Sequence, residues 1–212
     1  MFADSSVVVI TLAAYLVGSL SFAVIVSRLM GLADPRTYGS QNPGATNVLR
    51  SGNKQAAIAT LLFDALKGYL PVVLVKVLGP GLGLDDRVVA LVAISAFIGH
   101  LWPVFFGFKG GKGVATAAGI LFGVEPVLGL ATLGTWVIVA FFFRYSSLAA
   151  LAASLFAPAY YVLGDKVAWQ TSEAELLAVM AMSALLLMRH KDNITRLVSG
   201  QETKIGAKKD AA

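Results

Sequence analysis

The chain has 212 residues, of which 57% are hydrophobic and only 14% are charged, with a formal net charge of +5 at pH 7. Soluble domains carry about 25% charged residues, so this composition excludes an ordinary soluble protein and indicates an integral membrane protein. The absence of cysteine excludes disulfides and cysteine-based metal sites, and two histidines alone do not make a metal site. We therefore expect no metal and no cofactor, and we attribute the basic excess to membrane topology, not to a nucleic-acid partner.

Seven apolar segments predict an all-α, polytopic bundle in which residues 1–212 form a single membrane-embedded domain. A span needs about 20 apolar residues. The segment 114–124 is too short for a straight span, so it must be tilted, part of a broken helix or re-entrant. Residues 200–212 form a basic cytoplasmic tail that we expect to be frayed. The predicted segments are 6–32, 55–78, 88–106, 114–124, 126–143, 148–163 and 173–188.

Two of these segments contain polar residues within the apolar region. The first holds Gly18-Ser19-Leu20-Ser21, which fits either close helix packing through small residues or a polar cavity. The second holds Asp64 and Lys67, which share one helical face because they are three residues apart. These two charges either neutralise each other as an ion pair or support a functional site from behind.

The connection after the first segment is built of small and hydrogen-bonding residues. Glycine-rich turns that open into a helix present backbone N–H groups to anions, and an arginine fork suits phosphate. The alternative is a polar connection in which Thr46 or Asn47 caps the next helix. The residues that we predict to bind a phosphate here are Gly39, Ser40, Asn42, Gly44, Asn47 and Arg50.

A second polar loop, Lys109-Gly110-Gly111-Lys112, precedes the segment 114–124. Two lysines among glycines again describe a seat for an anion, although a flexible loop with inner-side positive charge is the simpler alternative. The loop is not a P-loop, because Gly113 stands where that motif requires serine or threonine. Nucleotide hydrolysis is therefore not expected.

Three further polar residues leave the later segments: Ser147, His190 and Asn193. No Ser-His-Asp order and no paired carboxylates accompany them, and neither histidine is followed by aspartate in a His-x4-Asp pattern. An enzyme with these residues would act by positioning its substrates and by stabilising anions, without a protein nucleophile.

The basic residues predict the orientation of the chain. If the N-terminus is outside, only Lys76, Arg87 and Lys166 of the 17 basic residues lie on the outer side, Lys67 stays within a span, and the others lie inside. We therefore predict an outside N-terminus and a cytoplasmic C-terminus, with every polar loop described above on the cytoplasmic side. A transporter would instead show polar groups near the midplane and on both faces.

At these residues the chain resembles the PlsY family, the bacterial acyl-phosphate:glycerol-3-phosphate acyltransferases. The resemblance runs from end to end, and its two loop motifs are long and specific. The two loops show no departure, but Ser19-Leu20-Ser21-Phe22 stands where the family often has Ser-Ile-Pro-Phe or similar. The matching stretches are Gly18-Ser19, 34–50, Asp64-x-x-Lys67-Gly68, Gly99-His100, 108–116, Ser147 and 189–197.

The resemblance implies transfer of a fatty acyl group from acyl phosphate to the 1-hydroxyl of glycerol 3-phosphate, giving lysophosphatidic acid and phosphate. It also implies a multi-pass protein of the bacterial inner membrane, with a seven-span fold, an active site near the cytoplasmic face and no required partner subunit. The residues that would take part in catalysis are Ser40, Arg50, Lys109, His190 and Asn193. Those that would bind substrate are Gly39, Ser40, Asn42, Gly44, Asn47, Arg50, Lys109, Gly110, Gly111, Lys112 and Ser147.

The sequence leaves the identity of the base and a second possible function open. Either a phosphate oxygen of the substrate or His190 takes the proton of the glycerol hydroxyl, and the absence of a carboxylate near these loops favours the substrate. The second possible function is an organophosphate or anion transporter, in which the same loops would bind phosphate transiently.

Overall fold

The computed structural model describes residues 2–206. In this part of the chain the regular elements are helices, and one isolated bridge joins Asp165 and Trp169. The predicted all-α class is therefore confirmed. The α-helices are α1 Phe2–Gly18, α2 Phe22–Leu29, α3 Ala45–Leu49, α4 Lys54–Leu78, α5 Asp86–Leu101, α6 Val114–Val124, α7 Pro126–Phe143, α8 Ser146–Leu163, α9 Glu173–Arg189 and α10 Lys191–Val198. Two 3₁₀ turns, η1 Pro80–Leu82 and η2 Val104–Phe106, lie in the connections.

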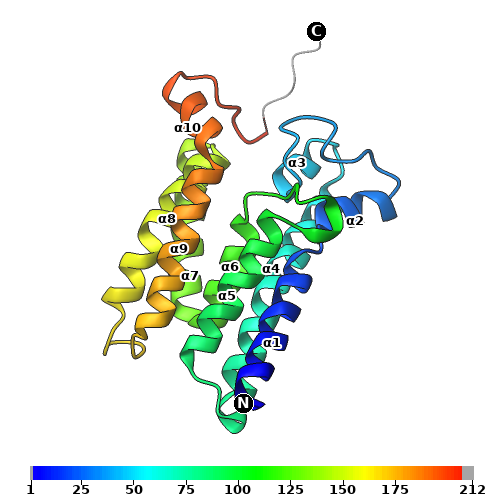
Figure 1. Ribbon diagram of the computed structural model, residues 1–212. Coiled ribbons are helices and arrows are strands. Elements are labelled where there is room, and N and C mark those ends of the chain that lie inside the picture. Colours follow the sequence, from blue (N-terminus) through cyan, green and yellow to red (C-terminus); the bar gives the residue numbers. More distant parts are fainter. Residues whose placement is uncertain (1, 207–212) are drawn as a thin grey trace.

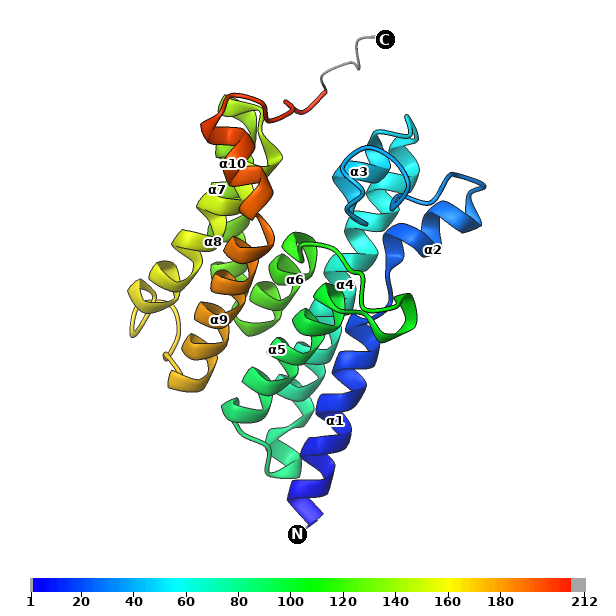
Figure 2. The same ribbon diagram turned by 45° about the horizontal axis from the view of Figure 1, so that its top comes forward.

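The long helices lie side by side along a common direction (Figure 1). α1, α4, α5 and α6 form one group, in which α4 packs along α6 and α1 along α5. α7, α8 and α9 form the second group, which Figure 2 shows beside the first. Contacts of α6 with α7 and of α5 with α9 join the groups around a core that includes Phe97, Ile120 and Leu128.

Four stretches are long and apolar enough to cross a membrane: Lys54–Leu78, Asp86–Phe106, Pro126–Phe143 and Ser146–Leu163. The bent pair Ser5–Gly18 and Phe22–Leu29 adds a fifth if it forms one span. α6 and α9 are shorter, with 11 and 17 residues. Apolar side chains point outward, as with Phe141 and Phe142, which are 76% and 73% exposed, and this is typical of a surface that lies in lipid.

The first predicted segment, 6–32, is not one continuous helix. It breaks at Ser19–Ser21, and α2 turns by 47° away from α1. Small residues explain the packing at the break, because a Cβ added at Gly18 would lie 2.1 Å from the carbonyl oxygen of Ala96. Ser19 is buried and donates to the Tyr15 carbonyl at 2.8 Å, so it is bound locally.

The short α6 runs beside the second half of α4. Its first turn lies against Gly68, where an added Cβ would be 2.3 Å from the Thr116 carbonyl oxygen, and its last residue, Val124, receives a hydrogen bond from Lys76 near the end of α4. The loop before α6 is bonded to the last turn of α5, since the Gly111 N–H donates to the His100 carbonyl. α4 therefore extends beyond the point where α5 ends and α6 begins, and the second polar loop lies beside its middle.

Candidate active site

The polar connections predicted from the sequence gather at one end of the bundle, opposite the start of α1 (Figure 1). α2, α3 and α10 lie at this end in both views (Figure 2). The first and second polar loops touch, because a Cβ added at Gly111 would lie 2.8 Å from the Pro43 carbonyl oxygen. Lys112 in turn hydrogen-bonds Asn193 of α10. The fold therefore brings segments that are far apart in sequence to one site.

Asn47 organises the first loop from inside. Its side chain is buried, with 2% of the residue exposed. Its oxygen accepts the Ser40 N–H at 3.0 Å, and its amide donates to the carbonyls of Pro35 at 2.6 Å and Tyr38 at 3.2 Å. Asn47 therefore positions the first loop through these hydrogen bonds.

The predicted helix caps are also corrected. α3 begins at Ala45 after Gly44, so Thr46 and Asn47 lie within the helix and do not cap it. The capping side chain of this region is Asn53, which accepts from the Ala56 N–H at the start of α4. α3 is short, and the buried hydrogen bonds of Asn47 hold the segment that precedes it.

Arg50, Ser40 and Gly39 face outward on the first loop. Gly39 has a φ of +60°, and a Cβ there would lie 3.3 Å from a guanidinium nitrogen of Arg50. The Arg50 guanidinium is exposed and makes no hydrogen bond or ion pair with the part of the chain that the structure describes, whereas its backbone N–H donates to the Asn47 carbonyl. The loop therefore presents a cation with free donors beside a serine hydroxyl, which suits a phosphate group.

An ion pair supports the beginning of this loop. Arg36 donates to both carboxylate oxygens of Asp34, at 2.6 to 3.1 Å, and its guanidinium lies 5.9 Å from the ring centre of Phe106. The hydrogen bond from Arg36 lowers the pKa of Asp34 below its usual value. Asp34 and Arg36 therefore connect the first loop to η2, which precedes the second polar loop.

In both loops, some backbone N–H groups that were predicted to bind substrate are hydrogen-bonded within the protein. The second polar loop, Lys109-Gly110-Gly111-Lys112, is called the glycine loop below. The Gly111 N–H donates to the His100 carbonyl at 3.2 Å, and the Ser40 and Gln41 N–H groups are bonded within the first loop. Arg189 holds the glycine loop from α9 by donating to the carbonyls of Gly110 at 2.9 Å and Gly111 at 3.1 Å. The backbone contribution to anion binding is therefore smaller than predicted.

A network around Glu202 joins Lys112, Ser147 and Asn193. The Glu202 carboxylate accepts from Ser147 at 2.7 Å, from Asn193 at 2.6 Å and from Arg196 at 2.7 Å. Burial opposes the charge, but these hydrogen bonds prevail and lower the pKa of Glu202. Lys112, Ser147 and Asn193 therefore lie together.

The tail that contains Glu202 is hydrogen-bonded to the rest of the protein. The Gln201 and Glu202 N–H groups donate to the Arg196 carbonyl, and the Ile205 N–H donates to the Arg144 carbonyl at 2.6 Å. The tail predicted to be frayed from residue 200 is therefore hydrogen-bonded as far as Ile205, and residues 207–212 lie outside the described part.

Two groups at the site have shifted pKa values. Burial, together with the nearby charge of Arg196, lowers the pKa of Lys112 to about 8. Burial lowers the pKa of His190 to about 4, so its imidazole is neutral at pH 7. The His190 Nδ1 lies 2.8 Å from the Leu186 carbonyl oxygen, which can only accept, so the proton is on Nδ1 and Nε2 is an acceptor.

The remaining predicted residues keep an exposed or intermediate position. Lys109 is exposed, and its ammonium group makes no hydrogen bond or ion pair with the described residues. Asn42 and Gly44 lie next to each other on the first loop. Sequence reasoning missed Arg189, Arg196 and Glu202 as site residues. The basic run after the last span was the signal for the two arginines, but a carboxylate in a tail carries no comparable signal.

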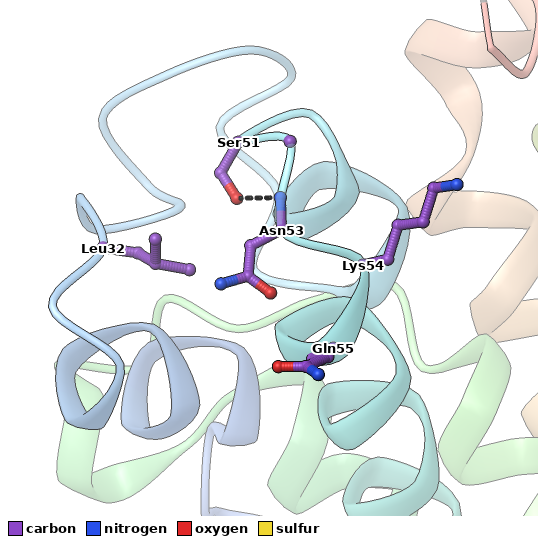
Figure 3. Close-up of a pocket in the computed structure, with 6 residues that line it drawn as sticks. Leu32, Ser51, Asn53, Lys54 and Gln55 are labelled. Carbon is purple, nitrogen blue, oxygen red and sulfur yellow. Dashed lines mark hydrogen bonds between the residues drawn. The ribbon is translucent and has the colours of Figure 1, made fainter.

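A hollow of about 630 Å³ opens beside the first loop (Figure 3). It is lined by residues 51–55 and Leu32, and in Figure 3 the Ser51 hydroxyl lies against the Asn53 N–H. It contains none of the residues predicted to act on substrate. Among the described residues, no group of three or more His, Cys, Asp or Glu is placed to hold a metal ion.

Fold and site together define an integral membrane protein with a cationic, hydrogen-bonding site at one end of a helical bundle. The family model of glycerol-3-phosphate acyltransferase matches residues 8–200. Glycerol-3-phosphate acyltransferases from Albidiferax ferrireducens and Cupriavidus pinatubonensis are 62% and 61% identical to the chain over 198 residues, which are 93% of this chain and 88% and 96% of those proteins.

Two crystal structures of PlsY (YgiH), an integral membrane glycerol 3-phosphate acyltransferase, share the fold. Its glycerol 3-phosphate form has a TM-score of 0.86 at 35% identity, and its lysophosphatidic acid form has 0.85 at 34%. In both, 95% of this chain and 96% of the other are covered. The chain belongs to the glycerol-3-phosphate acyltransferase family and is an acyltransferase. The transporter alternative finds no support in these matches.

Proposed function

We propose that the protein transfers a fatty acyl group from acyl phosphate to the 1-hydroxyl of glycerol 3-phosphate. The glycerol oxygen forms a bond to the acyl carbonyl carbon, the bond from that carbon to the phosphate oxygen breaks, and the products are lysophosphatidic acid and inorganic phosphate. Family membership supports glycerol 3-phosphate as the acceptor, as do the glycerol 3-phosphate and lysophosphatidic acid forms of the related PlsY. The observation that carries the proposal is the meeting of the two polar loops at Gly111 and Pro43, beside the hydrogen-bonded group of Lys112, Asn193 and Ser147 around Glu202.

The roles follow from exposure and charge. Arg50 and Lys109 are exposed cations, and Ser40 and Asn42 lie on the same loop as Arg50. We therefore assign the phosphate groups of the substrates to these four residues and Lys112. Ser147, His190 and Asn193 complete the pocket. Cationic donors aimed at the departing phosphate and at the oxyanion would stabilise the charge that develops in the transition state.

A phosphate oxygen of the substrate is the base that we favour. The imidazole of His190 is an acceptor at Nε2, but a pKa of about 4 makes it a weak base near neutral pH. A substrate phosphate carries its own negative charge to the site. The proton of the glycerol hydroxyl would then leave with a phosphate group.

The topology that we propose has seven spans, an outside N-terminus and a cytoplasmic C-terminus in the bacterial inner membrane. The distribution of basic residues supports this orientation. The gathering of the polar connections at one end of the bundle supports a site at the cytoplasmic face (Figure 1). The count of seven includes α9 and the shorter α6, which begins beside the middle of α4.

Activity in lipid with two donors tests the function. Purified protein receives glycerol 3-phosphate with palmitoyl phosphate, or with palmitoyl-CoA in parallel, and release of phosphate and formation of lysophosphatidic acid are followed. We expect product from the acyl phosphate alone, abolished by Arg50→Ala or Lys109→Ala. Lys54→Ala is the matched control, because Lys54 is an exposed lysine at the start of α4 with no assigned role. No product from either donor, in folded protein, would overturn the proposal.

A further inference from the structure

A buried polar cluster lies directly behind the glycine loop, and the mechanism above does not use it. It consists of Asp64 and Lys67 of α4, His100 of α5 and Thr116 of α6, which are 2%, 3%, 7% and 0% exposed. Ionised and polar groups in an apolar bundle are costly unless they are paired, so such a cluster is expected to have a specific use.

The four side chains form a connected chain of contacts. The Lys67 ammonium lies 2.7 Å from an Asp64 carboxylate oxygen and donates to the Leu20 carbonyl at 2.6 Å. The same Asp64 oxygen lies 3.8 Å from the His100 Nδ1. That nitrogen is 3.1 Å from the Thr116 hydroxyl, and either tautomer of the imidazole permits this hydrogen bond because a hydroxyl can donate or accept.

His100 also touches the glycine loop in two ways. Its carbonyl accepts the Gly111 N–H at 3.2 Å. Its ring packs against the loop so closely that a Cβ at Gly111 would lie 2.3 Å from the His100 Nε2. Thr116, which holds the other ring nitrogen, lies in the first turn of the helix that the loop enters. His100 therefore joins the loop to the first turn of the helix that follows it.

We propose that His100 is a positioning residue for the glycine loop, held in place by Thr116 and the Asp64–Lys67 pair, and that it sets the affinity for glycerol 3-phosphate. The proposal rests on the function proposed above, in which this loop and its lysines bind phosphate. A loop that is ordered before the substrate arrives does not have to be ordered at the cost of binding energy. Loosening the His100 ring should therefore weaken binding of the acceptor more than it slows the transfer step.

Paired substitutions at Thr116 test this directly. Thr116→Val removes the hydroxyl but keeps the shape, including the methyl group that packs against Gly68. A lost buried hydrogen bond that loosens the loop should raise the KM for glycerol 3-phosphate by about tenfold. The kcat and the KM for acyl phosphate should stay near the wild-type values. Thr116→Ser keeps the hydroxyl and should restore the wild-type KM.

Thr60→Val is the matched control. Thr60, in α4, is fully buried like Thr116, but its hydroxyl has no hydrogen-bond partner among the described residues. Thr60→Val should therefore leave the KM for glycerol 3-phosphate unaltered. If Thr116→Val does not fold, His100→Asn takes its place, because it removes the part of the ring that packs on Gly111 and should give the same rise in KM.

The outcomes separate the two proposals. A wild-type protein without activity would contradict the proposed function. An active wild type with an unchanged KM in Thr116→Val would overturn the role of His100. Equal losses of kcat in Thr116→Val and Thr116→Ser would also overturn it, because they would indicate a general packing role for Thr116.

Discussion

At the scale of single residues, burial separates the side chains that hold the site from those that are free to meet a substrate. Asn47 and Glu202 are largely buried and spend their polar atoms on neighbouring groups. Ser40, Arg50 and Lys109 are exposed at the same end of the bundle. Polar residues of similar appearance in the sequence therefore divide into a buried group that positions the loops and an exposed group.

The lowered pKa of Lys112 predicts how activity depends on pH. Its ammonium form should bind the phosphate, and its pKa in the free protein is about 8. The charged form prevails below that pH, so kcat/KM for glycerol 3-phosphate should fall as the pH rises above about 8, because this ratio reports groups of the free enzyme. Lys112→Arg should move the fall to higher pH. A fall at the same pH in both proteins would assign it to another group.

Replacement of His190 distinguishes the two possible bases. If a substrate phosphate takes the proton, His190→Ala should lower kcat by less than about 100-fold, whereas loss of a general base costs about 10²- to 10⁴-fold. His190→Asn serves as the control, since its amide can still donate to the Leu186 carbonyl but cannot act as a base. A larger loss in both variants, with unchanged thermal stability, would make His190 the base.

At the scale of elements, close contact between α4 and α6 places the glycine loop. A Cβ added at Gly119 would lie only 1.9 Å from the Ala65 carbonyl oxygen, so the two backbones approach without side chains between them. α6 is short, and its first turn lies beside the middle of α4. The loop before it therefore lies next to the buried cluster of Asp64, Lys67, His100 and Thr116.

Gly119→Ala should separate these helices. The added methyl group meets backbone atoms that cannot move aside, and such overpacking costs about 1–3 kcal/mol. We expect a lower midpoint of thermal unfolding in detergent, together with lower activity. Gly134→Ala in α7 is the control, because a Cβ there meets nothing within 4 Å and alanine favours the helix. Equal midpoints for the two variants would contradict the close packing of α4 and α6.

At the scale of the whole molecule, the polar connections are concentrated at one end of an apolar bundle. The opposite end also has a polar cluster, in which Glu175 accepts from the buried Tyr161 and lies 3.7 Å from Lys76. That cluster joins α4, α8 and α9 and contains none of the residues predicted to bind phosphate. The proposed sidedness of the enzyme therefore depends on which end faces the cytoplasm.

Single cysteines can establish the orientation because the chain has none of its own. Val167 between α8 and α9, and Val198 at the end of α10, are each 85% exposed and lie at opposite ends. In intact cells a membrane-impermeant maleimide should label Val167→Cys, and it should label Val198→Cys only after the membrane is permeabilised. The reverse pattern would contradict an outside N-terminus and a cytoplasmic C-terminus.

The sequence by itself determined the helical membrane class, most helix limits and the identity of the polar loops. These features depend on local composition: apolar runs, glycine-rich turns and charge distribution act over neighbouring residues. The resemblance carried by 34–50 and 108–116 likewise needed no tertiary information, and the family matches confirmed it.

Only the tertiary structure decided which polar residues are buried and which are exposed. Asn47 and Arg50 are three residues apart in the chain. Asn47 is buried and hydrogen-bonded to Pro35 and Tyr38, whereas Arg50 is exposed. Glu202 is joined to Ser147 across 55 positions of the chain. Such contacts join residues across a loop or between distant parts of the chain, so local patterns do not contain them.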